Sequence, residues 1–418
     1  MNVDTWRLGR RPALHRAQDL RRCEPLRMVV LFIFSVVLFL LSATGFVWID
    51  LSRDLRERAL DTAQIRRTVS NQSGREENVT PLAPGEPLNI LVLGIDSRKN
   101  QAPKFGSVED VEGIRGDTTI LVHVSGKRDS MTMVSIPRDL MVEIPNCLLS
   151  NGEELLASYG QVNSAMTLGS GANYDIAYGV ACAQSTIENL TGLQIDNYVV
   201  LDFKGFENVV DALGGVWFDV PQDVADPEAN AYLTEGCQLL NGEQALGYAR
   251  ARKTLGDGSD TSRIGRQQEL VAALVREVSR KVSSGNLPTL VTFVRSVLAA
   301  VYVSPQLASF EADLSLLSAV ANIPPQNVRL ITMPREPWEE DPNRDQPQEP
   351  YASQLWNALR HDESLVDGIG YLAGDGQSAA VVEEEPLLDQ VESSADVTHE
   401  LSPESGARES LACPPKAR

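Results

Sequence analysis

Histidine is scarce in this chain, and its few histidines lie too far apart in sequence to form a metal site. Only His15, His123, His361 and His399 occur among the 418 residues. None belongs to an HExxH pair or a similar close spacing, so the sequence gives no support to a zinc site built from histidines. Basic residues are outnumbered as well, and the formal net charge is -20. Nucleic-acid binding requires a basic face, so we expect no nucleic-acid partner.

Several common catalytic and nucleotide-binding motifs are also absent. The chain contains no GxxxxGK[ST] loop and no GxGxxG after a predicted strand, so nucleotide-binding folds lose their support. It contains no GxSxG turn of the kind that presents a nucleophilic serine. No cysteine lies beside a histidine that would serve as its base. The chemistry must therefore come from other residue types.

One long hydrophobic run is present, MVVLFIFSVVLFLLSATGFVWI at residues 28–49. It is uncharged and has about the ~20 residues that span a bilayer. Arginines dominate residues 1–27, so the positive-inside rule places the N-terminus in the cytoplasm and the remainder outside. The run is longer than the roughly 7–15 apolar residues of a signal peptide, and no A-x-A site follows. We predict a single-pass anchor in the cell membrane.

The five cysteines fit this topology. Cys23 is expected to be cytoplasmic and reduced, whereas Cys147, Cys182, Cys237 and Cys413 lie outside, where disulfides persist. Cys147 and Cys182 flank one segment and are the preferred pair. Cys237 has no obvious mate except Cys413. The sequence alone leaves the connectivity open.

The composition divides the chain into five parts. These are a basic cytoplasmic tail at 1–27, the transmembrane helix at 28–49, a polar extracellular linker at 50–87, a globular domain at 88–361 and an acidic tail at 362–418. The acidic tail has thirteen acidic and three basic residues, which is half of the net charge. With few aromatic residues, it is expected to be mostly disordered.

Within the globular domain, the hydrophobic patterns predict strands and helices in mixed order. Predicted strands lie at 89–95, 118–124, 130–136, 196–203, 216–220 and 327–333, and predicted helices at 185–192, 204–215, 241–250, 263–283, 287–301 and 306–321. The strands at 118–124 and 130–136 are close enough to form a hairpin, and Asn241 is a candidate helix cap. This order is typical of an α/β or α+β layered fold.

Arginine and aspartate recur where the predicted strands begin or end. Asp96 follows the first strand, Arg115 and Asp117 precede the second, and Arg138 follows the third. Taken singly, each such pair is typical of a surface salt bridge. Their recurrence at strand ends, where a rigid sheet positions loops, favours a functional site.

A second group of arginines lies in YARARKTLGDGSDTSRIGRQQEL, residues 248–270. It contains Arg250, Arg252, Arg263 and Arg266 around a Gly/Asp/Ser loop. These arginines are also compatible with the solvated sides of two helices. However, the planar guanidinium matches phosphate oxygens, and carboxylates hold Mg²⁺. Both groups together predict a site for a diphosphate and a divalent cation.

Several stretches, taken in order, resemble the LytR-CpsA-Psr family. They are NILVLGIDSR, RGDTTILVHV, MVSIPRDLMVEIP, QVNSAMTLGS, VVLDFKGFENVVDALGGV, LNGEQALGYARAR and DTSRIGRQQEL. The resemblance is strong over residues 88–300 and continues weakly to about residue 360. It implies a single α-β-α layered domain with a central mixed sheet and an apolar cavity for a lipid tail, preceded by one transmembrane helix.

The resemblance implies a phosphotransferase that acts outside the membrane. Such an enzyme moves a glycopolymer from a polyprenyl-pyrophosphate carrier onto peptidoglycan, at the C6 hydroxyl of muramic acid, and releases polyprenyl phosphate. A polyprenyl-pyrophosphate hydrolase and a non-catalytic protein that binds the carrier lipid or glycan remain alternatives. A regulatory role would need a cytoplasmic domain, which residues 1–27 are too short to supply. Teichoic acid, capsule and arabinogalactan all remain candidate polymers, and the form of residues 250–268 resembles actinobacterial members, which favours arabinogalactan.

The resemblance also implies roles for particular residues. Asp96 and Asp117 correspond to the ligands of Mg²⁺, for which Mn²⁺ is an alternative. The residues implied in pyrophosphate binding are Arg115, Arg138, Arg250, Arg252, Arg263, Arg266 and Gln267. Asp117, Arg138 and Arg115 are the residues implied in catalysis.

Overall fold

The structure is a computed structural model. It describes residues 59–69, 85–96, 113–251, 260–283, 293, 295–308, 320, 322–365, 369–380 and 413. The predicted cytoplasmic tail, the predicted membrane anchor at 28–49 and Arg252 lie outside the described residues. None of the helices in the described part of the chain is both long and apolar enough to cross a membrane.

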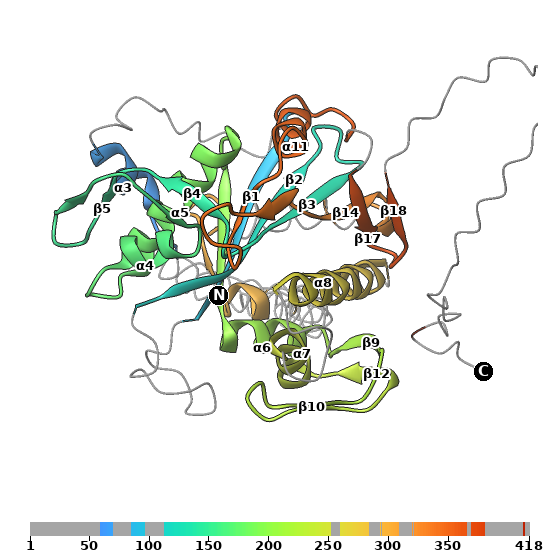
Figure 1. Cartoon of the computed structure of the whole chain (residues 1–418). Coiled ribbons are helices and arrows are strands. Elements are labelled where there is room, and N and C mark those ends of the chain that lie inside the picture. The colour runs from blue at the N-terminus through green and yellow to red at the C-terminus, as the bar shows by residue number, and fades with distance from the viewer. Residues whose placement is uncertain are drawn as a thin grey trace, which may run out of the picture. The chain divides into compact units, whose positions relative to one another are not determined.

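A central mixed sheet of eight strands organises the domain (Figure 1). Its spatial order is β13 (Tyr302–Val303), β8 (Asn197–Asp202), β1 (Leu88–Asp96), β2 (Arg115–Val124), β3 (Met131–Ile136), β14 (Val328–Thr332), β17 (Gly370–Ala373) and β18 (Ser378–Ala380). The pairs β1–β8 and β3–β14 are parallel, and the other neighbours are antiparallel. The mixed α/β architecture expected from the sequence is confirmed.

The strands at the centre of this sheet are apolar because both faces are buried. Successive side chains of a strand point to opposite faces, and β1 divides accordingly. Leu91, Leu93 and Ile95 join one core cluster, whereas Leu88 and Ile90 join another. An uninterrupted apolar run is therefore the expected pattern for this strand.

Helices cover both faces of the sheet (Figure 1). The first cluster includes residues of α4 (Ser164–Ser170), α5 (Ile176–Thr191) and α11 (Tyr351–Arg360). The second cluster includes Ala272 of α8 (Asp260–Ser283). The sheet is thus the middle layer between helices.

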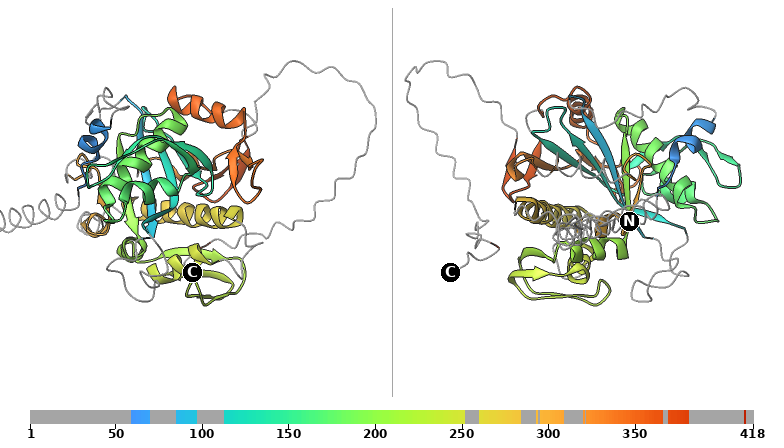
Figure 2. Two further views of the ribbon diagram at one scale, coloured as in Figure 1. Left: turned by 60° about the vertical axis from the view of Figure 1, so that its left-hand side comes forward. Right: turned by 180° about the vertical axis from the view of Figure 1, so that it is seen from behind.

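The helix α8 also has a second partner on its far side (Figure 2). Its residues Leu270 and Ala273 belong to a third core cluster, with residues from the elements that follow β8. These elements are α6 (Phe203–Ala212), β9 (Val216–Val220), β10 (Val224–Asp226), β11 (Ala231–Leu233), β12 (Gly236–Leu240) and α7 (Gly242–Arg250). The strands β9 and β12 pair with each other, outside the central sheet. Apolar residues of α8 at 270–275 therefore pack as core on both sides.

Several local predictions are confirmed. The segments at 118–124 and 130–136 form the antiparallel hairpin β2–β3. Asn241 caps α7, and its side chain and that of Gln244 form a reciprocal capping box. α5 ends at Gly192, which has a φ of 66° that favours glycine. Of the helix predicted at 287–301, residues 293 and 295–298 are helical, and most of the helix predicted at 306–321 lies outside the described residues.

Other boundaries differ from the prediction. β2 begins at Arg115, three residues early, and α5 begins at Ile176. The helix α3 (Thr62–Thr68), within the predicted linker, packs against the domain, and its Arg66 forms an ion pair with Glu188 of α5. β17 and β18 lie beyond residue 361, in the segment predicted as a tail. β17 pairs with β14, and β18 pairs with β17, so both belong to the central sheet. The folded domain thus extends past the predicted boundary.

Two disulfides join the extracellular cysteines of the predicted topology. Cys147 pairs with Cys182, with a Cα–Cα distance of 5.3 Å, and Cys237 pairs with Cys413. The preferred pair is confirmed, and the second pair joins the two cysteines that remained. The first bridge links the short hairpin of β5 (Cys147–Leu148) and β6 (Glu154–Leu155) to α5.

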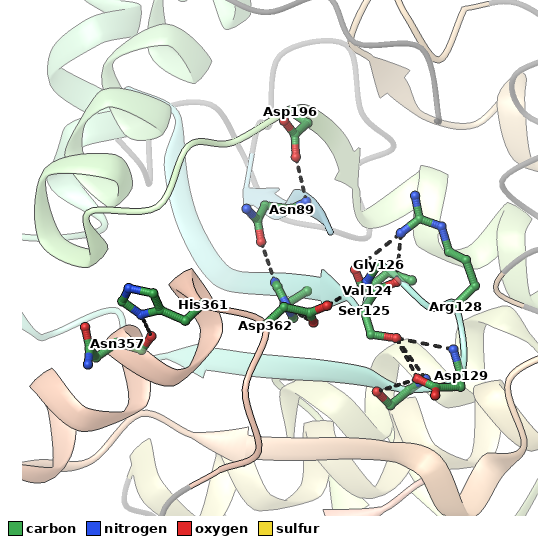
Figure 3. A network of polar contacts seen from close by, with 12 residues as sticks. Asn89, Val124, Ser125, Gly126, Arg128, Asp129, Asp196, Asn357, His361 and Asp362 are labelled. Carbon is green, nitrogen blue, oxygen red and sulfur yellow. Dashed lines mark hydrogen bonds and ion pairs between the residues drawn. The ribbon is translucent and has the colours of Figure 1, made fainter. Parts of the chain in front are cut away.

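A buried polar network lies near the end of β2 that is opposite to Arg115 (Figure 3). The Asn89 side-chain amide donates to the Gln194 carbonyl at 2.9 Å, so its Oδ1 faces His123 Nδ1 at 2.8 Å. His123 Nε2 lies 3.2 Å from Asp362 Oδ1, and the other oxygen of Asp362 accepts from the Gly126 N–H at 3.0 Å. This geometry places the proton of a neutral His123 on Nδ1.

The contact between His123 and Asp362 therefore depends on a second proton. Without it, the Nε2 lone pair faces a carboxylate, and neither group donates. Burial lowers the pKa of His123 below its ordinary value, while Asp362 opposes that shift and Arg128 adds to it. Because the pKa of His123 is lower in the folded protein than in the unfolded chain, the unfolded chain binds the proton more readily. The protein therefore loses stability as the pH falls from 6.5 through the folded pKa.

Replacing Asp362 with asparagine is expected to stabilise the protein at pH 8 and to lower the pKa of His123 further. An asparagine amide donates to the neutral Nε2, and asparagine tolerates the φ of 53° at this position. One new buried hydrogen bond contributes about 1 kcal/mol. Thermal unfolding at pH 8 and pH 5 and an NMR titration of His123 measure both effects. A stability gain that is as large at pH 5 as at pH 8 would contradict this account.

Candidate functional site

Four of the predicted site residues meet at one edge of the central sheet. β2 is antiparallel to β1 and begins where β1 ends, so Asp96 and Arg115 are cross-strand partners. β3 is antiparallel to β2, and its last residue Ile136 pairs with Thr119. Arg138, two residues after the end of β3, therefore lies at the same edge as Asp117. Cross-strand partners have Cβ atoms about 5 Å apart, so this edge concentrates both carboxylates with two arginines.

A β-bulge determines how Asp117 is presented. Gly94 of β1 pairs with Thr118, but the next residue, Ile95, pairs with Gly116, so Asp117 opposes no residue of β1. A bulge re-aims the extra residue and is common beside functional sites. Gly94 permits the close approach of the two strands here, because a Cβ at this position would lie 3.0 Å from Thr118 Cβ.

Arg138 is held by two carboxylates. One Nη donates to Asp117 Oδ1 at 3.1 Å, and Nε donates to Asp139 Oδ2 at 3.3 Å. The side chains of Arg138 and Asp117 are 22% and 27% exposed, so both remain accessible to a ligand. Asp96, in contrast, is only 6% exposed. The guanidinium is thus oriented before any ligand arrives.

Asp139 is in turn fixed by groups from two other hairpins. Its Oδ1 accepts from Gln161 Nε2 at 2.9 Å, and Gln161 ends β7 (Ser158–Gln161), which pairs with β4 (Met141–Ile144). The Asp139 carbonyl accepts from the Asp345 N–H at 3.3 Å. Asp345 begins β16 (Asp345–Pro347), and its carboxylate pairs with Arg335 of β15 (Arg335–Pro337). Both hairpins therefore support the position of Arg138.

Arg250 reaches this edge from the end of α7. β8 runs parallel to β1, with Asp202 paired to Ile95, and Phe203 follows directly as the first residue of α6. The Arg250 guanidinium lies 4.4 Å from the centre of the Phe203 ring. A cation stacked on an aromatic ring is held in place without neutralising its charge. Arg250 is thereby placed beside the ends of β8 and β1.

The first turns of α8 carry the other predicted arginines that the structure describes. Arg263, Arg266 and Gln267 share one helix face by their spacing, and the two arginines are 6% and 7% exposed. Gln268 donates to Thr332 Oγ1 at 3.0 Å and lies 3.4 Å from Ser135 Oγ, which ties α8 to the ends of β14 and β3. With a helical rise of 1.5 Å per residue, Arg263 lies roughly 8 Å along the axis from that anchor.

Arg266 also connects the two helices that carry arginines. One of its Nη atoms donates to the Ala251 carbonyl at 2.6 Å, directly after Arg250. The Tyr248 hydroxyl lies 3.5 Å from Glu269 Oε2, and burial raises the pKa of Tyr248. These contacts join the C-terminal end of α7 to the first turns of α8, close to the arginines that both helices carry.

The structure brings Asp96, Arg115, Asp117 and Arg138 to one edge and attaches α7 and α8 there. Arg252 lies outside the described residues. Among the described residues, no group of three or more His, Cys, Asp and Glu side chains comes together in a form that would hold a metal ion. Two neighbouring carboxylates, however, match the way in which proteins bind Mg²⁺, through one or two carboxylates with waters and phosphates. The supporting roles of Gln161 and Asp345 were not predicted, because both depend on pairing between hairpins.

A family comparison matches most of the chain. The model of the LytR_cpsA_psr family matches residues 57–361. This range includes every predicted site residue from Asp96 to Gln267. It also begins just before α3, in agreement with the packing of α3 on the domain.

Individual relatives are similar over shorter stretches. The probable cell wall biosynthesis protein LcpB of Corynebacterium glutamicum is 34% identical over 204 residues, which cover 48% of this chain and 43% of that protein. The polyisoprenyl-teichoic acid–peptidoglycan teichoic acid transferase TagV of Bacillus subtilis is 31% identical over 199 residues, with 46% and 44% covered. The chain spans about half the length of these curated relatives.

A solved structure supports the fold. The crystal structure of B. subtilis TagV superposes with a TM-score of 0.51 and 25% sequence identity. The superposition covers 68% of this chain and all of that chain. The central mixed sheet with helices on both faces is therefore a fold that the two proteins share.

Proposed function

This chain belongs to the LytR-CpsA-Psr family, and on that premise we propose that it is a glycopolymer–peptidoglycan phosphotransferase. The observation that carries the proposal is the Asp117–Arg138 pair beside Asp96 and Arg115 at one sheet edge. The name of the relative TagV states that it transfers teichoic acid from a polyisoprenyl carrier to peptidoglycan. We extend the same reaction class, though not the same polymer, to this chain.

In the proposed reaction, a hydroxyl group of the acceptor attacks the sugar-side phosphorus of the donor diphosphate. The new P–O bond joins the glycopolymer to peptidoglycan, at the C6 hydroxyl of muramic acid. The bond from that phosphorus to the bridging oxygen breaks, and polyprenyl phosphate leaves with that oxygen, while the proton of the attacking hydroxyl passes to the solvent. Negative charge grows on phosphate oxygens, and positioned guanidinium groups stabilise it. We assign this role to Arg138 and Arg115 at the sheet edge, together with Arg250 and the arginines of α8.

Asp96 and Asp117 are the residues that would hold Mg²⁺, or Mn²⁺ in its place. Their fit rests on two carboxylates from adjacent strands, one of them projected by a bulge. When bound, the ion would neutralise part of the diphosphate charge. Arg138 already donates to Asp117, and we expect this bond to keep the carboxylate oriented towards the ligand.

The donor would be lipid-linked, and the predicted anchor at 28–49 would keep the domain at the membrane surface. With the N-terminus in the cytoplasm, the described residues would lie outside the cell, where peptidoglycan is found. The disulfide Cys147–Cys182 supports an oxidising compartment. Among candidate polymers we favour arabinogalactan or a related wall glycan over teichoic acid.

The test incubates the full chain with a short polyprenyl-pyrophosphate glycan and Mg²⁺, and measures the release of polyprenyl monophosphate. We expect release that needs the metal and that Asp117→Asn reduces at least 100-fold. Asp219→Asn is the matched control, because Asp219 is an exposed residue of β9, which pairs with β12 outside the central sheet.

Adding peptidoglycan fragments then separates transfer from hydrolysis. Transfer yields a glycan attached to the fragment through one phosphate, whereas hydrolysis yields a free glycan phosphate. Tight donor binding without release, unchanged by Asp117→Asn, would contradict the enzymatic assignment and leave a carrier-binding protein.

Asp139 provides a separate prediction, because it accepts a bond from Arg138 and is not among the residues proposed to bind the metal or the diphosphate. Asp139→Asn leaves one side-chain oxygen where Arg138 Nε and Gln161 Nε2 now each have their own acceptor, and it removes the negative charge, so the guanidinium loses its charge-assisted bond. Loss of one charge-assisted bond is expected to lower kcat roughly tenfold, with KM for the donor changing less. Steady-state kinetics on the same donor measures both values. An equal loss in Asp219→Asn would show that the effect is not specific to this position.

A further inference from the structure

An aromatic pair lies beside the candidate site and is not used by the mechanism above. Tyr159 of β7 is 57% exposed, and its ring centre lies 6.2 Å from that of the half-buried Trp338, with a 50° angle between the rings. The two residues come from hairpins that are far apart in sequence. An exposed tyrosine next to a tryptophan is a common feature of binding surfaces, since both offer large rigid faces.

The register of the β4–β7 ribbon places this pair next to Arg138. Tyr159 and Gln161 are two residues apart on β7, so their side chains lie on the same face, roughly 7 Å apart. Gln161 donates to Asp139, and Asp139 accepts from Arg138. Two hydrogen bonds therefore lead from the neighbour of Tyr159 to the guanidinium.

The second hairpin is docked on the same residues. The Trp338 N–H donates to the Arg344 carbonyl at 2.9 Å, within the hairpin of β15 and β16. That hairpin contacts the start of the ribbon through the bridge between Leu140 and Asp345. The Tyr159 hydroxyl lies 3.4 Å from the Met141 carbonyl, to which it donates. Both rings are thus fixed relative to the site.

The charge around the pair restricts what it binds. Glu336, Glu339 and Glu340 are exposed on the β15–β16 hairpin, and Glu143, the cross-strand partner of Tyr159, is also exposed. The arginines of this hairpin, Arg335 and Arg344, form ion pairs with Asp345 and Asp341. An anionic polymer would be repelled here, whereas a neutral ligand would not.

We propose that Tyr159 and Trp338 form a platform that packs against the C–H face of a neutral pyranose ring. Such rings are apolar on their faces and polar at their edges, which suits an exposed tyrosine ring beside a half-buried tryptophan ring, with charged side chains around them. This inference rests on the proposed function, in which a sugar is attached to the phosphate and another carries the attacking hydroxyl. The sugar belongs either to the acceptor strand or to the donor glycan.

The experiment measures binding without turnover, so it does not depend on the proposed reaction. The full chain is titrated with a neutral β-1,4-linked N-acetylglucosamine tetramer, as an acceptor probe, and with the donor glycan pyrophosphate lacking its lipid. Binding is followed by calorimetry and by saturation-transfer NMR. We expect Tyr159→Ala and Trp338→Ala each to raise the Kd of one of the two probes at least fivefold.

Two variants serve as controls. Tyr159→Phe keeps the ring and loses only a bond to a backbone carbonyl, so it should bind as the wild type does. Tyr232→Ala removes a tyrosine that is 61% exposed on β11, outside this site, and should also bind normally. Weakened binding of the tetramer alone identifies the acceptor as the source of the sugar, and weakened binding of the donor glycan alone identifies the donor.

If the binding of neither probe depends on Tyr159 or Trp338, the platform is wrong, whether or not the protein cleaves the donor. If the tetramer binds through the platform but the donor is never cleaved, the platform stands and the proposed reaction fails. If the donor is cleaved and the binding of both probes is unaffected by either alanine variant, only the platform is overturned.

Discussion

Replacing Arg138 with alanine is expected to lower the rate of donor cleavage about 100- to 1,000-fold, which is the usual cost of one positioned donor to developing negative charge. Arg138 donates to Asp117 at the sheet edge, and its guanidinium is partly exposed to a ligand. The measurement is polyprenyl monophosphate release under single-turnover conditions, which separates the chemical step from product release.

The arginine fork, and not only its charge, should matter at this position. Arg138→Lys retains a cation but loses the planar donors that bind Asp117, Asp139 and a phosphate at once. We expect it to recover less than a tenth of the wild-type rate. Arg67→Ala, at an exposed position of α3, is the matched control and should be fully active.

Loss of activity has to be separated from loss of structure. Without Arg138, the carboxylates of Asp117 and Asp139 lose a shared cation, so a modest fall in stability is expected. Both groups are about a quarter exposed, and water screens their repulsion. A variant that retains at least half of the wild-type rate would remove Arg138 from the reaction, even if its stability falls.

The parts of the fold that were predictable are those whose signal is local. The apolar run of β1, the short connection in the β2–β3 hairpin and the capping box at Asn241 each lie within a few residues. β17 and β18 were missed because β17 joins the sheet by pairing with β14, where Arg329 lies opposite Ala373 across a long stretch of sequence, and β18 pairs only with β17. The acidic composition averaged over residues 362–418 concealed two short edge strands.

The same division applies to the candidate site. Asp96, Asp117 and Arg138 were predictable because strands that neighbour each other in sequence bring their ends to one edge. The bulge at Asp117 was not predictable, because it depends on the register between β1 and β2. Gln161 and Trp338 were missed for a related reason: each acts through a hairpin whose docking on residues 139–140 is a tertiary contact.

Removing the Cys147–Cys182 disulfide is expected to lower the free energy of unfolding by roughly 3–4 kcal/mol, from the loop closed by a sequence separation of 35. The double variant Cys147→Ala/Cys182→Ala avoids a lone thiol. Both cysteines are 3% exposed and belong to the largest core cluster, so small side chains should be accommodated. For a domain of this size the melting temperature should fall by roughly 10 °C.

This disulfide also bears on the site, because it fastens the segment that carries the β4–β7 ribbon to α5. We therefore expect the double variant to remain able to bind the donor near 20 °C but to lose activity at a lower temperature than the wild type. Cys23→Ala, at the cysteine predicted to be cytoplasmic and reduced, is the matched control and should melt as the wild type does. Reducing agent should shift the melting temperature of the wild type towards that of the double variant. A melting temperature within 2 °C of the wild type, an effect on the order of 1 kcal/mol or less, would mean that packing around α5 alone holds this segment.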